Sequence, residues 1–257
     1  MVELVLIGIG TGNLEHLTLE ALREMKACDL ILLPRKGDDK AALAEVRQEL
    51  CAQHLGKQTR ISEFDMPVRD VSVSPYKKRV DDWHEAIAKR WFEAIGSQSG
   101  DVNKVGLLVW GDPSLYDSTL RIAQKLPEGL QVKVRVVAGI TSLQCLTAAH
   151  AITLNTIGDP VQITTGRQLR DNGFPTGVDT IAVMLDGDCS FQTLDPADIE
   201  IWWGAYVGMP EQILQSGPLS EKGPEIVSLR AAARKQHGWI MDIYVLRRSA
   251  PELAATS

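Results

Sequence analysis

The segment Val2-Glu-Leu-Val-Leu-Ile-Gly-Ile-Gly-Thr-Gly-Asn13 decides the fold of this chain. It begins with a nearly continuous apolar run of strand length, Val2 to Ile9, which is typical of a buried parallel strand. Gly8, Gly10 and Gly12 stand at the end of this strand, where glycine permits a tight turn and lets a ligand approach the backbone closely. The segment therefore predicts an α/β fold whose first strand runs into a candidate binding loop.

Strands and helices alternate outward from this segment. Apolar residues recur at helical spacing from Leu17 to Met25, and the apolar run Leu30 to Leu33, closed by Pro34, indicates a second strand and so a βαβ unit. Further along the chain, the pattern predicts a helix with Asp38 as its N-cap, a helix over Val80 to Ile95, and strands at Val105 to Trp110 and Val132 to Val137.

The segment Arg60 to Pro75 lies between the two predicted helices. It carries both signs of charge and shows neither helical nor strand periodicity. We interpret it as a loop that can act as a lid over bound substrate.

After about Asn155 the predicted strands become shorter, which indicates a second α/β unit. We therefore expect two small α/β domains with mixed sheets, residues 1–155 and 156–257, and a frayed tail from Ser249 to Ser257. The strands expected in the second domain are Val161 to Thr165, Thr180 to Leu185, Ile199 to Trp203 and Ile240 to Leu246.

Composition excludes several classes of protein. With 44% hydrophobic and 23% charged residues, the chain resembles an average globular protein rather than a disordered one. Its formal net charge of −6 argues against a nucleic-acid binder, which needs a basic surface. The apolar runs are far shorter than the roughly 20 residues that cross a bilayer, and no basic segment precedes the first strand, so we expect a cytoplasmic protein that does not enter membranes.

The four cysteines, Cys28, Cys51, Cys145 and Cys189, are far apart in the sequence. They form no Cys-x-x-Cys pair and no histidine cluster accompanies them, so we expect buried thiols rather than disulfides or a metal site.

The glycine loop alone is also compatible with an NADP-dependent oxidoreductase. A dinucleotide-binding loop usually has glycine where this chain has Asn13, and an acidic residue after the second strand, where this chain has Arg35 and Lys36. Those two cations are compatible with a 2′-phosphate, so the loop leaves this alternative open.

Two further turns of the same kind follow apolar strands. The first follows the strand that ends at Trp110 and reads Trp110-Gly-Asp-Pro-Ser-Leu-Tyr116. The second follows the next strand and reads Ala138-Gly-Ile-Thr-Ser142. In this order, with the Gly8 to Asn13 loop before them, they resemble the tetrapyrrole methylases of siroheme and cobalamin synthesis. Three more segments are similar to methyltransferases of aerobic cobalamin synthesis, so that the resemblance covers almost the whole chain: Leu185 to Cys189, Trp203 to Tyr206 and His237 to Asp242.

This resemblance implies a cofactor and a partner. The cofactor is S-adenosylmethionine, folded into the cleft between two α/β domains, and the substrate is a tetrapyrrole, a precorrin, bound by a homodimer. S-adenosylmethionine has no phosphate, so its site needs apolar walls, short polar groups and main-chain amides, and no metal. Carried over by position, the cofactor-binding residues are Gly111, Asp112, Leu115, Thr141, Ser142, Leu185, Ala205, Tyr206 and Val207.

The chain departs from the family at two places. Thr11-Gly12-Asn13 stands where relatives have Pro-Gly-Asp, and Ala138 stands where they have Pro. The loss of the acid at Asn13 removes one candidate for a catalytic base.

Substrate binding and catalysis require other groups. Methyl transfer needs mainly positioning, whereas cleavage of a carbon–carbon bond beside a ketone needs acid–base help, for which we consider His16, Tyr116 and Asp117. We interpret Asp186 and Asp188 as members of a turn after a strand. Precorrins carry acetate and propionate groups, so basic residues are candidate partners, in a surface that includes Arg35, Lys36, Arg69 and Arg170. We assign Gly10, Gly12, Arg121 and Arg167 to the substrate site; a corrinoid-binding module without catalysis is a third interpretation.

Overall fold

The structure, a computed structural model, describes residues 1–35, 41–56 and 58–248. It divides into two compact units, Met1–Thr141 and Ser142–Ser257. The boundary precedes the expected one at residue 155, because helix α5 (Ser142–His150) packs against strands of the second unit. The predicted N-cap Asp38, the cation Lys36 and the predicted tail Ser249 to Ser257 lie outside the described residues.

The first unit contains a five-stranded sheet in the order β3-β2-β4-β1-β5. Every neighbouring pair is parallel, so the carboxyl ends of all five strands lie at one edge. Strand β1 is the most deeply buried, with Leu4 to Ile7 fully inaccessible, as its apolar sequence predicts. The strands are β1 (Val2–Gly8), β2 (Leu30–Arg35), β3 (Arg60–Asp65), β4 (Lys104–Val109) and β5 (Val132–Val137).

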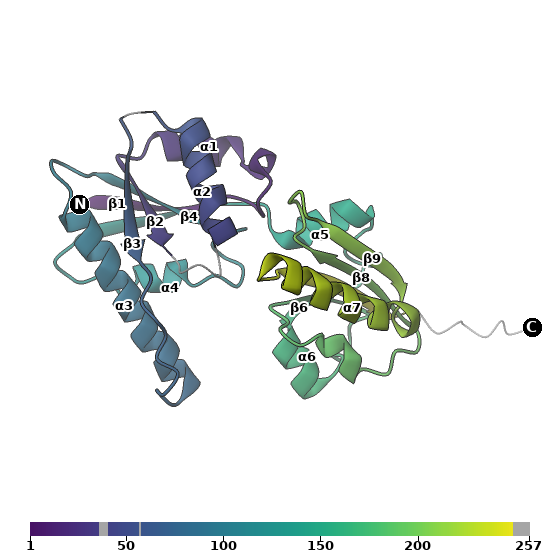
Figure 1. Cartoon of the computed structure of the whole chain (residues 1–257). Helices are drawn as coiled ribbons and strands as arrows, with labels where there is room; N and C mark the ends of the chain where they lie inside the picture. Colours follow the sequence, from purple (N-terminus) through teal and green to yellow (C-terminus); the bar gives the residue numbers. More distant parts are fainter. Residues whose placement is uncertain (36–40, 57, 249–257) are drawn as a thin grey trace, which may run out of the picture. The chain divides into compact units, whose positions relative to one another are not determined.

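Helices cover both faces of this sheet (Figure 1). On one face, α3 (Tyr76–Gly96) buries Ile87 and Trp91, and α4 (Thr119–Ala123) buries Ile122. On the other face, α1 (Leu19–Lys26) buries Met25, and α2 (Ala41–His54) buries Leu50. Covered on both faces, the inner strands β1, β2 and β4 can be apolar almost throughout, which is why their sequences show runs rather than alternation.

Strand β3 corrects one prediction. The segment Arg60 to Pro75 was expected to be a loop throughout, but residues 60–65 pair in parallel with β2. The sequence hides this strand because it is at the edge of the sheet, where only Phe64 is buried and the other residues meet solvent.

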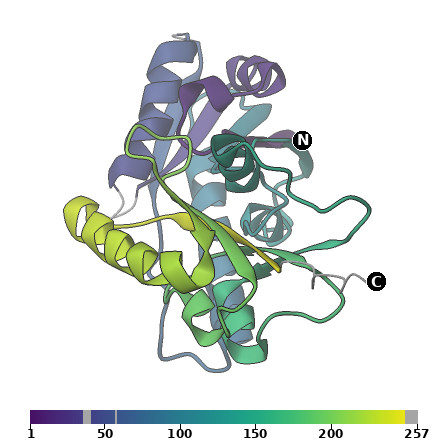
Figure 2. The same cartoon turned by 90° about the vertical axis from the view of Figure 1, so that its right-hand side faces the viewer.

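The second unit contains the mixed sheet that the sequence predicts, whereas the first sheet is parallel. Its strand order is β6-β7-β10-β8-β9, and only β6 and β7 are parallel neighbours. Helix α7 packs along β8 and β9 (Figure 2). The elements are β6 (Val161–Thr165), α6 (Gly166–Asn172), β7 (Thr180–Met184), β8 (Ile199–Ala205), β9 (Ile213–Pro218), α7 (Leu219–His237) and β10 (Asp242–Arg248).

The core of this unit contains Trp203, Phe191 and Tyr244, all nearly inaccessible to solvent. Strand β9 was not predicted, since none of its residues is buried and its sequence contains Ser216 and Gly217.

All four cysteines are buried and free, which confirms the prediction of unpaired thiols. Burial raises the pKa of Cys28 to about 12 and those of Cys51 and Cys189 to about 11, so these thiols are protonated and unreactive at neutral pH. Over the described residues, no helix is long and apolar enough to cross a membrane, and no cluster of three ligating side chains could hold a metal ion.

Candidate functional site

Backbone hydrogen bonds join the loops that follow β1 and β4. The Ile9 N–H donates to the Val109 carbonyl at 2.9 Å. Gly10 and Gly111 then form an isolated antiparallel bridge, in which the Gly111 N–H donates to the Gly10 carbonyl at 2.7 Å. The two glycine motifs of the sequence therefore form one structural feature.

The carboxylate of Asp112 ties the third loop to this pair. One of its oxygens accepts from the Gly139 N–H at 2.8 Å, and the other accepts from the Ser114 N–H at 2.8 Å and from the Ser114 hydroxyl. Partial burial opposes ionisation, but these hydrogen bonds hold the pKa of Asp112 below its ordinary value. Asp112 is thus an ionised carboxylate that fixes the loops, which we call the three-loop junction: Ile9–Gly12, Gly111–Ser114 and Ala138–Thr141.

Glycine is required in the junction because the backbones nearly touch. A Cβ on Gly139 would lie 2.1 Å from the Gly111 carbonyl oxygen, and a Cβ on Gly8 would lie 2.6 Å from Gly139. Gly111 differs: its φ is +67°, and a Cβ there would meet only the Thr141 Cα, at 3.9 Å. The side of Gly111 that lacks a side chain therefore faces open space that a ligand can approach.

The predicted cofactor residues of the first unit fit a ligand without phosphate. Leu115 is half-buried beside the junction and can supply an apolar wall, while Thr141 is buried directly next to Gly111. Ser142 begins α5 and so belongs to the second unit. Gly12 has a φ of +105° and lies in the same loop as Gly10.

The candidate acid–base residues lie close to the junction along the chain. His16 ends the short 3-10 helix Leu14–His16, and its Cβ is 2.7 Å from where a Cβ on Gly10 would lie. Its Nε2 lies 3.4 Å from Asn13 Nδ2, so the residue that replaces the family's acid contacts the candidate histidine.

Tyr116 and Asp117 have different roles from one another. Tyr116 is 42% exposed with a φ of +50°, and burial of part of the ring raises its pKa, so its hydroxyl stays protonated at neutral pH. Asp117 Oδ1 accepts from the Thr119 N–H at 2.6 Å, which commits one carboxylate oxygen to starting α4. Tyr116 is therefore the more accessible proton donor of the two.

In the second unit, the predicted residues follow β7 and β8. Both strands are antiparallel to β10, which lies between them, so their carboxyl ends share one edge. Leu185 is 66% exposed with a φ of +53°, so its side chain is accessible from solvent. Ala205 and Val207 are buried, and the hydroxyl of buried Tyr206 donates to the Trp239 carbonyl at 2.5 Å. The main chain of Tyr206 is also engaged, since its N–H donates to the Met241 carbonyl and its carbonyl accepts from the Met209 N–H, each at 2.9 Å.

Asp186 supports the turn that presents Leu185, which confirms its interpretation as a turn residue. Its carboxylate accepts from the Tyr244 hydroxyl at 2.6 Å and from the N–H groups of Ser190 and Asp188, at 2.6 and 3.0 Å. Burial raises its pKa, but these bonds outweigh burial and keep the pKa below the ordinary value. The sequence did not reveal that Tyr244 bonds to Asp186, because no local pattern in the apolar strand β10 indicates a hydrogen bond to a distant turn.

Most of the described basic residues of the predicted substrate surface already interact with other side chains of the chain. Arg35 pairs with Asp65 at 3.0 Å, Arg170 pairs with Asp188 at 2.8 Å, and the guanidinium of Arg69 lies 4.3 Å from the centre of the Trp83 ring. Arg167 is exposed in the first turn of α6, and Arg121 is exposed on α4. These two belong to different units, so each stands as a separate candidate.

Comparison with known proteins identifies the family to which this chain belongs. A family model described as Tetrapyrrole (Corrin/Porphyrin) Methylases matches residues 3–223. A protein named Precorrin-6A synthase (deacetylating), from Sinorhizobium sp, is 44% identical over 253 residues, 97% of each chain. The match therefore includes all three loops of the junction and the turns of the second unit.

Two solved structures show the same architecture. A cobalamin synthesis related protein (CobF) from Corynebacterium diphtheriae has a TM-score of 0.82 at 36% identity, covering 96% of this chain and 99% of that one. A uroporphyrin-III C-methyltransferase from Thermus thermophilus, complexed with S-adenosylhomocysteine, has a TM-score of 0.54 at 17% identity, covering 95% and 92%. The second likeness concerns the fold alone.

Proposed function

Because this chain belongs to the tetrapyrrole methylase family, we propose that it converts precorrin-5 to precorrin-6A, methylating C-1 and releasing the acetyl group there as acetate. It is an S-adenosylmethionine-dependent methyltransferase of cobalamin biosynthesis. The full-length relative named for the deacetylating synthesis of precorrin-6A carries the proposal of this particular step.

The cofactor is S-adenosylmethionine, and the residues of the three-loop junction fit it. When bound, it supplies an electrophilic methyl group on a sulfonium. We assign its first-unit contacts to Gly111, Leu115 and Thr141, since Gly111 leaves open space and its neighbours offer apolar and short polar surfaces. Asp112 acts on these contacts by fixing the loops, and Leu185 is the exposed side chain offered by the second unit.

Loss of the acetyl group needs proton transfers that methyl transfer does not. Water must add to the ketone before the carbon–carbon bond breaks and electron density is released at C-1. We assign the base to His16, next to Gly10, and proton donation to Tyr116, whose raised pKa keeps it protonated. Asp117 keeps a helix-starting role in addition to any proton transfer.

The other two interpretations fit less well. An NADP-dependent oxidoreductase would use cations at the end of β2 to hold a 2′-phosphate; of the two that the sequence offers, Arg35 is paired with Asp65 and lies 3.8 Å from Glu63, and Lys36 lies outside the described residues. A corrinoid-binding module without catalysis would not need the close-packed glycines and the Asp112 bonds of the junction.

Calorimetry separates the three interpretations. S-adenosylhomocysteine, NADP and NAD are titrated separately into the same preparation, and we expect heat only from the first. Binding of NADP without binding of S-adenosylhomocysteine would establish the oxidoreductase instead. Failure of all three to bind, with retained binding of a corrinoid, would establish the binding module.

The assembly and location are also part of this proposal. We propose a homodimer, as the family resemblance implies, and we propose that it works in the cytoplasm. Light scattering should then give twice the chain mass of 28.2 kDa, and a single-chain mass would contradict the dimer.

A further inference from the structure

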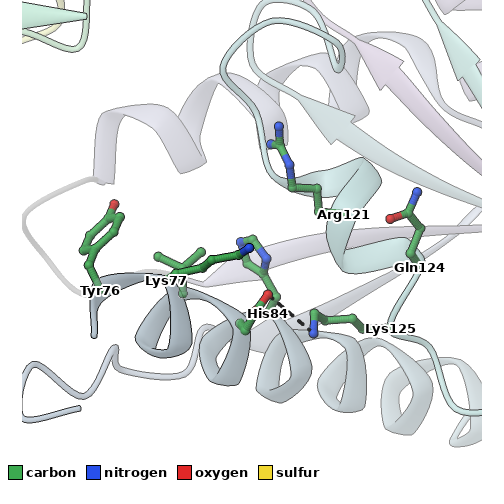
Figure 3. A pocket seen from close by; sticks show the side chains of 8 residues that line it. Tyr76, Lys77, His84, Arg121, Gln124 and Lys125 are labelled. Atoms are coloured by element: carbon green, nitrogen blue, oxygen red, sulfur yellow. Dashed lines mark ion pairs between the residues drawn. The ribbon is translucent and has the colours of Figure 1, made fainter. Parts of the chain in front are cut away.

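A pocket of about 570 Å³ lies between α3 and α4 in the first unit. This volume is within the range of about 300–1,000 Å³ that small-molecule sites occupy. Its walls come from the first turns of α3 and from α4 with the residues after it, and include Lys77, Asp81, His84, Arg121, Gln124 and Lys125 (Figure 3). The mechanism described above uses none of these residues except Arg121.

His84 is the unusual member of this pocket. The residue is 2% exposed, yet its Nε2 has no hydrogen-bond partner among the residues that the structure describes. Figure 3 shows the ring pointing from α3 toward α4. A buried ring nitrogen without a partner costs free energy, so a ligand that supplies one is favoured.

Two cations of the pocket are not neutralised. Lys125 is paired with Glu85 at 3.0 Å and Asp81 at 3.6 Å. By contrast, neither Lys77 nor Arg121 forms an ion pair with any residue in the described part of the chain; Arg121 donates only to the backbone carbonyl of Asp117. Asp81 is the one acid among the described residues that line the pocket, and it is already paired with Lys125. The charges of Lys77 and Arg121 therefore give the pocket a net positive charge.

The first turns of α3, which line the pocket, lie toward the carboxyl edge of the sheet. Strand β3 ends at Asp65 at the carboxyl edge, and α3 starts from that side at Tyr76 before returning to the beginning of β4. Helix α4 begins soon after the Gly111–Ser114 loop of the junction. The first turns of α3 and the junction thus belong to the same end of the unit.

We propose that this pocket binds a peripheral carboxylate of the tetrapyrrole substrate, with Lys77 and Arg121 as its cations and His84 as a buried hydrogen-bonding group. The inference rests on the proposed function, since it takes precorrin-5 as the ligand. A carboxylate accepts hydrogen bonds from all three side chains and replaces its lost hydration with cations.

The amino-acid end of S-adenosylmethionine also carries a carboxylate, but it fits this pocket less well. Its ammonium group would need an acidic partner, and Asp81, the acid of this pocket, is paired with Lys125. Binding of S-adenosylhomocysteine distinguishes the two sources, because only the tetrapyrrole source leaves it unchanged in pocket variants.

The test measures kcat and KM for precorrin-5 in Lys77→Gln, His84→Phe and His84→Gln, with S-adenosylhomocysteine affinity measured in each. We expect KM to rise about tenfold in Lys77→Gln and His84→Phe with kcat within twofold, because the lost contact serves binding. His84→Gln, which keeps a donor, should recover part of the loss. Lys89→Gln, an exposed cation further along α3 and outside the pocket, is the matched control and should keep the wild-type KM.

Two results would overturn the inference. One is a KM within twofold of wild type in Lys77→Gln, which is exposed and so should fold normally; the other is a parallel loss of S-adenosylhomocysteine affinity. Equilibrium binding of precorrin-5 separates this failure from failure of the proposed function. If wild type binds precorrin-5 but releases no acetate, and Lys77→Gln still weakens binding, the pocket stands and the proposed reaction fails.

Discussion

At the scale of single residues, Gly111 tests the proposed cofactor site. Its φ of +67° favours glycine, and we propose that the cofactor approaches its open side. Gly111→Val places a branched side chain in that space, so we expect S-adenosylhomocysteine affinity to fall at least about tenfold, or ~1.4 kcal/mol, by calorimetry.

Gly100→Val is the matched control for this substitution. Gly100 also has a positive φ, +75°, but its Cβ would meet nothing within 4 Å and it lies before β4, at the opposite end of the strand from Gly111. Both variants should lose stability from backbone strain, roughly 1–3 kcal/mol, and only Gly111→Val should lose affinity. Equal affinities in the two variants would remove this loop from the cofactor site.

Asp112 illustrates a role that sequence reasoning assigned only in part. Its position in a predicted cofactor loop was recognisable, but its bond to the Gly139 N–H joins residues 27 positions apart. No local pattern reveals such a pairing. The same is true of Asp186 and Tyr244, which lie 58 positions apart.

Asp112→Asn should weaken the junction. The amide has one acceptor oxygen, so one of the two N–H groups now met by the carboxylate loses its partner, at a cost of about 1–3 kcal/mol in the free energy of unfolding. Since hydrogen bonds lower the pKa of Asp112 in the folded protein, its contribution is present above the ordinary carboxyl pKa and is lost as the pH falls through the lowered one. Urea unfolding at pH 7 and at acid pH should therefore show a difference between wild type and variant that shrinks in acid; a constant difference would contradict this account.

His84 predicts a second dependence on pH. Burial lowers the pKa of its imidazole; Asp81 opposes this shift, and Lys125 and Arg121 add to it. The histidine therefore binds a proton more readily in the unfolded chain than in the folded one. The free energy of unfolding falls as the pH drops below about 6.5, the ordinary pKa of histidine. Between pH 7.5 and 5.5, wild type should lose more unfolding free energy in urea than His84→Gln does. Equal losses would show that the buried ring does not titrate abnormally.

At the scale of elements, apolar runs located β1, β2 and β4 because those strands are buried in the sheet, whereas the valines of β5 revealed a strand in which only Val137 is buried. Strands β3 and β9 escaped prediction because their little-buried sequences, RISEFD and ILQSGP, contain few β-branched residues, whereas the edge strands β5 and β6 were recognisable from their valines and threonines. Turn chemistry was more informative, since the glycine loops were placed correctly at the ends of β1, β4 and β5.

The junction between these three elements depends on Gly139. A Cβ there would lie 2.1 Å from the Gly111 carbonyl oxygen and 2.7 Å from the Gly8 Cα, both in backbone that cannot move separately. Gly139→Ala should therefore separate the loops and lower both the unfolding free energy and the affinity for S-adenosylhomocysteine. Gly129→Ala, where a Cβ would meet nothing within 4 Å, should leave both unchanged. Wild-type affinity in a folded Gly139→Ala would contradict the junction.

At the scale of the whole molecule, the alternation of elements predicted two α/β units, and the structure contains both. The expected boundary came later than the observed one because a helix at a boundary has no sequence mark that assigns it to either side; α5 is placed by its packing on β8, β9 and β10. The candidate site could be predicted as a set of loops and residue types. The pocket that contains His84 could not, because its walls come from separate helices and its charge balance depends on which cations are already paired.

The central claim concerns the reaction itself, and product stoichiometry tests it most directly. Purified protein is incubated with precorrin-5 and S-adenosylmethionine labelled with ¹³C in the methyl group, and acetate, S-adenosylhomocysteine and the labelled carbon are measured together by NMR. We predict equal amounts of acetate and S-adenosylhomocysteine, with the ¹³C label in a new methyl group bonded to C-1 of the tetrapyrrole. Methylation without acetate, acetate without methylation, or the label on another carbon would contradict the proposed reaction.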